Sequence, residues 1–169
     1  DPKVYALLAT GETKGVFQLE SSGMQQLFRA MKTDRFGDIV AGVSLFRPGP
    51  LGSGMCKSYV ERKNGREKVT SFHPLVDEHL KDTYGVVVYQ EQVMMVARAL
   101  AGYTLARADL LRRAMGKKKP AEMAKERVGF VEGAGKNGVD VQEANRIFDL
   151  LDFFSGYGFN VSHASGYAL

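Results

Sequence analysis

The sequence predicts a mainly α-helical fold: a helical domain with turn-rich loops and at most short strands. Apolar residues recur at helical spacing in most of the chain, and clusters of glycine and proline separate these segments. A chain of 169 residues with 44% hydrophobic and 25% charged side chains has the size and composition of one ordinary globular domain. No internal repeat or low-complexity tract divides it, so residues 1–169 are predicted to form a single domain.

Two amphipathic helices are predicted in the first third of the chain. In residues 23–31 the apolar side chains stand at positions 24, 27, 28 and 31, which is the stripe of a helix face, and Ser21 and Ser22 are candidate caps. Residues 34–46 repeat this spacing. Pro48 should end the second helix, because the residue before a proline disfavours helical backbone.

The segment 47–55, Arg-Pro-Gly-Pro-Leu-Gly-Ser-Gly-Met, contains three glycines and two prolines. This composition favours an ordered, turn-rich loop with exposed backbone amides over a helix or strand. Those amides and the hydroxyl of Ser53 are candidate phosphate ligands, because glycine lets the backbone approach a phosphate closely. A purely structural turn is the alternative, and the spacing matches neither a P-loop nor GxGxxG.

The second half of the chain is predicted to be helical. The β-branched run 85–89 is a candidate short strand that leads into a helix. Gly116 is predicted to close one helix, Pro120 to open the next, and Asn137 with Gly138 to form a turn. The predicted helices are residues 90–101, 104–115, 120–133 and a last one that begins at Asp140 or Val141 and runs through Phe154.

Several classes of function are disfavoured by the composition. No apolar run approaches the roughly 18 residues of a membrane span and the first residues lack a signal-peptide profile, so a cytoplasmic protein without a membrane partner is expected. Cys56 is the only cysteine and the three histidines are scattered, which gives no zinc pattern. No Asp-x-Asp occurs, and the acidic pairs 149/152 and 122/126 have the spacing of helix surface charges. We therefore expect no catalytic metal site in this chain.

Positive charge is concentrated in one segment. Residues 98–136 contain ten Lys and Arg against four Asp and Glu, a net charge of +6, whereas the whole chain carries only +4. The rest of the chain is therefore at −2. Charge concentrated in this way indicates a polyanionic partner.

Within this segment, the run 110–119, Leu-Leu-Arg-Arg-Ala-Met-Gly-Lys-Lys-Lys, carries the strongest local signal. On a helix, Arg112 and Arg113 could together hold one polyphosphate, or one could bind phosphate while the other pairs with a carboxylate. Lys117, Lys118 and Lys119 follow as candidate phosphate contacts. The alternative is a solvated basic face with a lysine-rich C-terminal turn, which the helix dipole favours.

The segment 155–163, Ser-Gly-Tyr-Gly-Phe-Asn-Val-Ser-His, alternates aromatic residues with glycines. Rings presented in this way, here Tyr157 and Phe159, can stack on nucleic-acid bases. The alternative is a turn whose aromatic residues close a core. His163 has no triad-like partners in the sequence, so a structural histidine is its alternative role.

Six blocks, taken together and in order, resemble the bacterial family C replicative DNA polymerases, the family of the DNA polymerase III alpha subunit. The resemblance covers essentially the whole chain. The blocks are TKGVFQLE (13–20), RPGPLGSGM (47–55), YG with YQEQVM (84–94), AGY (101–103), DLLRRAMGKKKP (109–120) and GYGFN with SH (156–163).

The resemblance implies that the chain is the helical fingers region of such a polymerase, excised from a longer chain whose palm lies upstream of residue 1. It implies that Arg112 and Arg113 face the triphosphate of the incoming deoxynucleotide, that Tyr157 and Phe159 lie beside its base and sugar, and that His163 tests the 2′ side of the sugar. Arg47, Ser53 and the three lysines are assigned to DNA or phosphate.

The implied partners are template-primer DNA, deoxynucleoside triphosphates and, through the parent chain, other subunits of the replicase. Mg²⁺ is implied as the cofactor of the parent polymerase, held by palm aspartates outside this chain, so the chain alone is expected to be inactive. Two positions depart from the family pattern: Val161 replaces the usual Lys, and Ala106 with Arg107 replaces a Gly-Gly pair.

A hypothesis from another class is also compatible with the residues: a non-enzymatic, helical nucleic-acid-binding module that uses the same basic segment. A protein-interaction domain with a solvated basic face is a third. An Asp-x-Asp on predicted strands upstream of residue 1 would favour the polymerase over the binding module.

Overall fold

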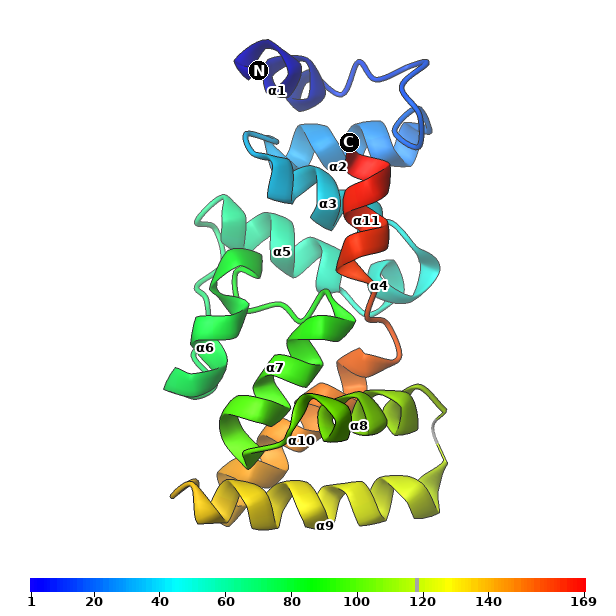
Figure 1. Cartoon of the computed structure of the whole chain (residues 1–169). Coiled ribbons are helices and arrows are strands. Elements are labelled where there is room, and N and C mark those ends of the chain that lie inside the picture. Colours follow the sequence, from blue (N-terminus) through cyan, green and yellow to red (C-terminus); the bar gives the residue numbers. More distant parts are fainter. Residues whose placement is uncertain (118) are drawn as a thin grey trace. The chain divides into compact units, whose positions relative to one another are not determined.

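The structure is a computed structural model that describes residues 1–117 and 119–169. The described residues form eleven α-helices and one short 3-10 turn, with no β-strand, which confirms the prediction of a mainly α-helical fold (Figure 1). No helix in the described part of the chain is long and apolar enough to cross a membrane. The elements are α1 (Pro2–Thr10), α2 (Ser22–Met31), α3 (Phe36–Leu45), α4 (Pro48–Gly52), α5 (Met55–Lys63), α6 (Pro74–Leu80), η1 (Lys81–Thr83), α7 (Gln90–Ala101), α8 (Leu105–Lys117), α9 (Pro120–Lys136), α10 (Val141–Ser155) and α11 (Val161–Ala168).

The elements group into two compact units. The first contains Asp1–Thr70, Asp82–Val86 and Phe159–Leu169, and the second contains Ser71–Lys81 and Val87–Gly158. That residues 1–169 form a single domain stays a prediction.

The first unit is built on α2, α3 and α5. Helix α2 begins as predicted at the Ser21 cap, whose hydroxyl accepts a hydrogen bond from the amide of Met24. Its stripe of Met24, Leu27, Phe28 and Met31 is buried, and α11 packs against α3 (Figure 1). The apolar spacing of this segment thus predicts both a helix and the face that it buries.

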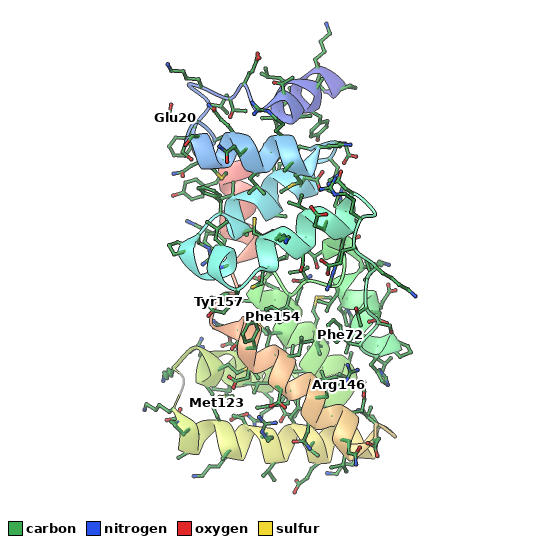
Figure 2. The ribbon with its side chains drawn as sticks, turned by 180° about the vertical axis from the view of Figure 1, so that it is seen from behind. Glu20, Phe72, Met123, Arg146, Phe154 and Tyr157 are labelled. Carbon is green, nitrogen blue, oxygen red and sulfur yellow. The ribbon has the colours of Figure 1, made fainter. Side chains whose placement is uncertain are left out.

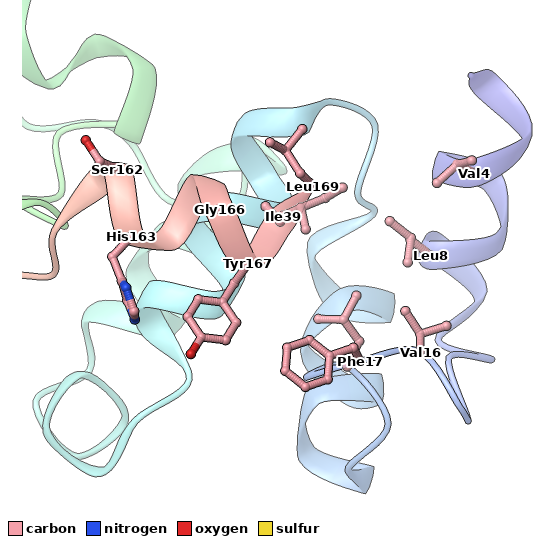
Figure 3. A pocket seen from close by; sticks show the side chains of 12 residues that line it. Val4, Leu8, Val16, Phe17, Ile39, Ser162, His163, Gly166, Tyr167 and Leu169 are labelled. Carbon is pink, nitrogen blue, oxygen red and sulfur yellow. The ribbon is translucent and has the colours of Figure 1, made fainter.

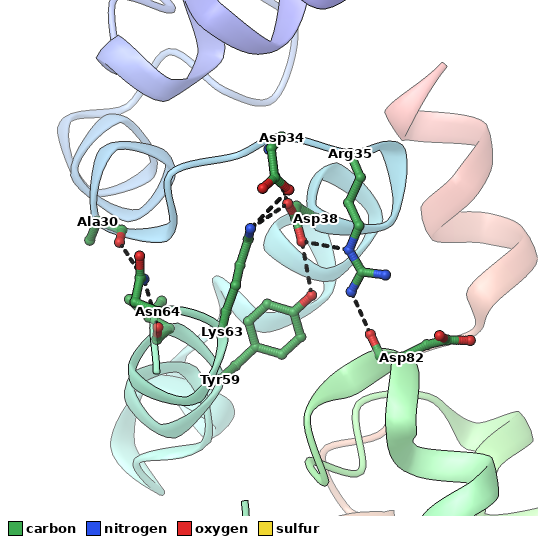
Figure 4. Close-up of polar contacts among 9 residues, drawn as sticks. Ala30, Asp34, Arg35, Asp38, Tyr59, Lys63, Asn64 and Asp82 are labelled. Atoms are coloured by element: carbon green, nitrogen blue, oxygen red, sulfur yellow. Dashed lines mark hydrogen bonds and ion pairs between the residues drawn. The ribbon is translucent and has the colours of Figure 1, made fainter. Parts of the chain in front are cut away.

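A buried ionic cluster lies inside the first unit (Figure 4). The side chain of Asp38 is 0% exposed and contacts Lys63 Nζ at 3.2 Å and Arg35 Nε at 3.3 Å. The hydroxyl of Tyr59 donates to the same carboxylate at 3.3 Å, and Lys63 Nζ also donates to Asp34 at 2.9 Å. Because a buried charge is tolerated only when it is paired and hydrogen-bonded, these contacts account for an aspartate in the core.

The second unit packs α7, α8, α9 and α10 around one apolar core that includes Leu100, Leu111, Phe130 and Phe148. Helices α7 and α9 approach closely, since a Cβ added at Gly133 would stand 2.4 Å from the carbonyl oxygen of Ala101.

A polar contact joins α10 to the segment before α6 within the second unit. Arg146 Nη2 donates to the carbonyl of Phe72 at 2.8 Å, and its guanidinium lies 5.8 Å from the ring centroid of Phe72 (Figure 2). Arg146 also pairs with Glu143 on its own helix at 2.7 Å. These contacts tie a long connecting segment to the helical core.

The start of α7 is fixed by the side chain of Gln92. Its Oε1 accepts hydrogen bonds from the amides of Val88 at 2.8 Å and Tyr89 at 2.9 Å, and its Nε2 donates to the carbonyl of His79 at 3.3 Å. A strand needs its amides for a neighbouring strand, whereas here they bond to a side chain. The candidate strand at 85–89 is therefore wrong, and the helix at 90–101 is confirmed with both ends.

Two local predictions are corrected. The segment 47–55 is not a loop, because α4 occupies Pro48–Gly52 and α5 begins at Met55. Proline suits the first position of a helix, where its missing N–H is not needed, and between α4 and α5 the helical path is broken at Gly54, at φ +81°. Helix α8 also runs through Gly116 to Lys117, since a glycine near a helix end is tolerated when packing fixes the helix.

Besides α4, four further helices were not anticipated from the sequence: α1, α5, α6 and α11. Each has fewer than ten residues, too few for a stripe of apolar positions to repeat clearly. Short helices of this kind depend on tertiary packing for their stability.

Candidate functional site

Both predicted arginines are organised by a single carboxylate on α8. Asp109 Oδ1 accepts from Arg112 Nε at 2.9 Å and from Arg112 Nη2 at 2.7 Å, while Asp109 Oδ2 contacts Arg113 Nε at 2.8 Å. The residues are three and four apart, so they share one helix face. The hydrogen bonds from Arg112 hold the pKa of Asp109 below its usual value, and the charges of both arginines add to this effect.

The two arginines differ in how firmly they are held. The side chain of Arg112 is 25% exposed, and its Nη1 makes a further hydrogen bond to Gln90 Oε1 at 3.2 Å. That of Arg113 is 64% exposed and contacts Asp109 through Nε at 2.8 Å. Arg113 can therefore accept an anion with little rearrangement, whereas Arg112 offers a more rigid guanidinium.

The lysines at the end of α8 are placed in part. Lys117 is exposed in the last turn of α8, and Lys119 precedes α9 and pairs with Glu122 at 3.1 Å. Lys118 lies outside the described residues. A lysine in the last turn of a helix is also favoured by the helix dipole, so Lys117 fits both roles considered from the sequence.

Arg107, the departure from the family pattern on α8, is neutralised locally. It pairs with Glu126 through two contacts of 2.9 and 2.7 Å, and its guanidinium lies 4.8 Å from the ring centroid of Tyr103. The hydrogen bond to Glu126 raises the pKa of Arg107. Its charge is therefore matched within the unit.

Tyr157 lies in the turn after α10, half-buried, with its amide donating to the carbonyl of Phe154 at 2.9 Å. Its ring packs edge-on against Phe153 at 5.9 Å between centroids. The next residue, Gly158, accepts a hydrogen bond from Gln90 Nε2 at 3.4 Å. Gln90 therefore joins Arg112 to the turn that carries Tyr157.

In the first unit, Phe159, just before α11, and two residues of α11 form a row of rings at four-residue spacing. The rings of Phe159 and His163 lie 5.5 Å apart, and those of His163 and Tyr167 lie 4.7 Å apart. The row continues to Phe17, whose ring is parallel to Tyr167 at 5.8 Å. At the other end, the guanidinium of Arg47 lies 4.7 Å from the ring centroid of Phe159, a cation–π contact.

Beside this row, α11, α1 and the segment before α2 line an apolar groove of about 680 Å³ (Figure 3). His163, Tyr167 and Phe17 are among the residues that line it. The side chain of Phe17 is 71% exposed, which is unusual for a phenylalanine.

Arg47 and Ser53, predicted as phosphate contacts, stand at the two ends of α4. Arg47 Nε donates to the carbonyl of Ser44 at 2.8 Å, and burial lowers the pKa of its guanidinium. Ser53 Oγ donates to the carbonyl of Pro50 at 3.3 Å. The amides of Leu51 and Ser53 bond to Arg47 and Gly49 carbonyls at 3.0 and 2.9 Å, so the expectation of exposed amides is wrong there.

The structure thus gathers the predicted residues into two sets. Arg112, Arg113 and Tyr157 are connected through Asp109 and Gln90 in the second unit, whereas Arg47, Phe159 and His163 are in contact in the first. Ser53 and Lys119 make polar contacts with other residues, Pro50 and Glu122, and Lys117 is exposed.

Four residues of these two sets were missed by sequence reasoning: Asp109, Gln90, Phe17 and Tyr167. The four-residue spacing from Asp109 to Arg113 and from His163 to Tyr167 was a usable signal. Gln90 and Phe17 contact residues that are far away in the sequence, so no local sequence pattern indicated these contacts.

The described residues offer little to a divalent cation. Nowhere in residues 1–117 and 119–169 do three His, Cys, Asp or Glu side chains gather as a metal-binding group. Three of the four carboxylates within the basic segment, Asp109, Glu122 and Glu126, are engaged in ion pairs. These residues do not fit the Mg²⁺ site of a polymerase, so we assign no step to a metal in this chain.

Comparison with known proteins gives a family. The family model described as the bacterial DNA polymerase III alpha subunit finger domain matches residues 1–138. The chain belongs to this family. The polymerase III finger-domain assignment confirms the resemblance seen in the six sequence blocks.

Relatives of this finger domain are similar in sequence along its whole length. The chain is 55% identical to the DNA polymerase III subunit alpha of Haemophilus influenzae, 53% identical to that of Pseudomonas aeruginosa and 52% identical to that of Escherichia coli K12. Each match covers 100% of this chain and 15% of the relative. The chain therefore spans about a seventh of the length of these proteins.

Proposed function

We propose that the chain is the fingers portion of a bacterial replicative DNA-directed DNA polymerase, which binds the incoming deoxynucleoside triphosphate and template-primer DNA for nucleotidyl transfer. The observation that carries the proposal is the pair of arginines held on one helix face by Asp109, in a chain that belongs to the finger-domain family. Guanidinium groups in fixed positions suit the bidentate recognition of phosphate oxygens.

The contribution of this chain to nucleotidyl transfer is positioning and neutralisation of charge. Phosphoryl transfer asks for little covalent chemistry from the protein, because negative charge shifts among phosphate oxygens along the reaction path. Arg113, which is the more exposed, is proposed to contact the triphosphate with its two terminal nitrogens. Arg112, held by Asp109 and Gln90, is proposed to supply a donor that does not need to reorganise during the reaction.

The aromatic residues are proposed to act on the base and sugar. Tyr157 and Phe159 carry rings on either side of Gly158, and His163 packs against Phe159. His163 is proposed to discriminate at the 2′ position of the sugar. Lys117, Lys118, Lys119, Arg47 and Ser53 are proposed to contact phosphates of DNA or of the nucleotide, where a point charge or a hydroxyl is sufficient.

The rest of the catalytic machinery is proposed to lie outside this chain. The palm, with aspartates that hold Mg²⁺, is proposed to precede residue 1 in the parent polypeptide, which would leave the chain inactive alone. The same polypeptide is proposed to contact other replicase subunits. A polymerase that copies the bacterial chromosome works in the cytoplasm, so the proposal gives the chain that location.

The test is single-turnover incorporation by the full-length subunit with Arg112→Ala, Arg113→Ala and the corresponding Lys variants. Losing one positioned donor to a charged transition state typically costs about 3 kcal/mol, so each Ala variant should lower the incorporation rate roughly 100-fold. Lysine should restore only part of the rate at a bidentate contact.

The matched control is Arg66→Ala. Arg66 is a partly exposed arginine of the first unit, and its pair with Glu61 resembles the pair of Arg112 with Asp109. Its removal should leave incorporation near the wild-type rate, and thermal melts check that all variants are folded. Near-normal rates for both Arg112→Ala and Arg113→Ala would refute the proposal.

A further inference from the structure

Gln90, the first residue of α7, makes hydrogen bonds in two directions within the second unit. Its Oε1 accepts from Arg112 Nη1 at 3.2 Å, and its Nε2 donates to the carbonyl of Gly158 at 3.4 Å. The two partners come from α8 and from the turn after α10. One amide side chain therefore spans two elements that are 46 residues apart at these positions.

The backbone around Gln90 is held by a helix cap and by close packing against the turn after α10. Two residues further on, Gln92 caps the start of α7 by accepting from the amides of Val88 and Tyr89. The turn approaches so closely that a Cβ added at Gly158 would stand 3.2 Å from Gln90 Cγ and 3.3 Å from its backbone nitrogen. A glycine at 158 is therefore part of the fit, and the side chain of Gln90 is confined between the turn and Arg112.

We infer that Gln90 is a positioning residue that couples Arg112 to the Tyr157–Gly158 turn, so that the triphosphate and the base of one nucleotide are held in register. The inference rests on the proposed function, because it takes Arg112 as a triphosphate contact and Tyr157 as a base contact. Gln90 itself touches neither part of the nucleotide. It acts by fixing the distance between two groups that do.

The chemistry of the amide supports this role over simple space filling. The arginine needs an acceptor and the carbonyl needs a donor, and glutamine carries both at the end of one side chain. Methionine has a similar length, but its thioether has no hydrogen-bond donor and is only a weak acceptor. Asparagine keeps both groups on a side chain one methylene shorter, which cannot reach both partners from the same backbone position.

The experiment measures binding to the full-length polymerase on a primer ended with a dideoxynucleotide, so that no incorporation follows. Two ligands are compared: the correct deoxynucleoside triphosphate and inorganic tripolyphosphate, which has no base. Loss of positioning should weaken nucleotide binding by Gln90→Met and Gln90→Asn about 10-fold, the effect expected for one hydrogen bond to a charged group. Tripolyphosphate has no base that must be aligned with the turn, so its binding should be weakened threefold or less.

Two controls sharpen the result. Gln142→Met makes the same substitution at an exposed position of α10 and should change neither affinity. In a double-mutant cycle, Gln90→Met and Arg112→Lys should be non-additive, because the first acts through the second. If Gln90→Met fails to fold in thermal melts, Gln90→Asn provides the same comparison with a polar side chain that a helix start accepts.

Equal weakening of both ligands, additive effects in the cycle, or unchanged nucleotide affinity would overturn the inference. These outcomes are distinguishable from failure of the proposed function. If Arg112→Ala and Arg113→Ala leave both affinities unchanged, the triphosphate site itself is wrong. If those variants lose affinity while the Gln90 variants do not, only the coupling by Gln90 is refuted.

Discussion

Two aspartates show how the setting of a residue decides its role. Asp38 and Asp109 each contact two cationic side chains, but Asp38 is completely buried whereas the side chain of Asp109 is 29% exposed. In the interior, removing one partner leaves a charge without compensation, so Asp38 is expected to hold the fold together. At the surface an anion from solution can compete for the arginines, so Asp109 can organise a binding site.

The edge of the buried cluster yields a prediction about pH. The hydrogen bond from Lys63 lowers the pKa of Asp34 below its ordinary value of 3.8. A depressed carboxyl pKa contributes stability that is present above the unfolded value and is lost as pH falls through the folded value. The free energy of unfolding of wild type should therefore exceed that of Asp34→Asn by up to about 1 kcal/mol at pH 6, since Asp34 is largely exposed.

Urea unfolding of both proteins between pH 2.5 and pH 6 provides the measurement. The difference between them should shrink as pH falls below 3.8. In a Lys63→Met background the pH-dependent difference should disappear. A difference that stays constant across this range would show that the ion pair with Lys63 does not stabilise the fold.

At the scale of elements, helix positions are decided by contacts that local sequence does not reveal. Helix α9 contains Gly129, Gly133 and Gly135, which would lower its intrinsic stability in isolation. Gly133 is explained by α7, because there is no room for a side chain against the carbonyl of Ala101. Gly135 has open space around it.

These two glycines give a matched pair of substitutions in one helix. Gly133→Ala should lower the free energy of unfolding by about 2 kcal/mol, since a backbone carbonyl must move to admit the methyl group. Gly135→Ala should raise it by about 0.5 to 1 kcal/mol through helix propensity alone. Thermal and urea unfolding of the two variants measure both effects. Similar changes of the same sign would contradict the close packing of α7 and α9.

At the scale of the whole molecule, charge is unevenly distributed. The basic segment 98–136 lies entirely within the second unit. Part of it is neutralised locally, by Glu126 on Arg107 and by Asp149 on Arg127. In the described part of the segment, four exposed cations make no ion pair: Arg98, Lys117, Lys125 and Lys136.

This distribution predicts weak, sequence-independent binding of DNA that depends strongly on salt. Contact of four cations with phosphates should give a slope near −4 in a plot of log affinity against log salt concentration. Lys117→Ala and Lys125→Ala should each reduce this slope by about one, because each removes one phosphate contact. Fluorescence anisotropy with two unrelated duplexes at several salt concentrations measures the affinities and hence this slope.

The control for DNA binding is Lys3→Ala, which removes an exposed lysine of the first unit. Its slope should equal that of wild type. An affinity that does not change with salt, or a clear preference for one duplex, would contradict the prediction. Binding that persists while the arginine variants of the polymerase retain normal rates would favour the nucleic-acid-binding module.

The sequence by itself determined the helical class, most of the long helices and the family. Repeating apolar positions identified α2 and α10 because helices of ten or more residues leave a periodic pattern on one face. The Arg112 and Arg113 pair was visible for a similar reason, since its residues are adjacent. Motif blocks in order gave the resemblance that the family model then matched.

Only the tertiary structure decided which residues work together. Gln90 and Arg112 are 22 residues apart, and Gln90 and Gly158 are 68 apart, so no window of sequence contains these contacts. The short helix α4 and the stack of Phe17 on Tyr167 likewise depend on neighbours brought close by folding. Local periodicity records which face of an element is buried, but the identity of its neighbour is set by packing between distant segments.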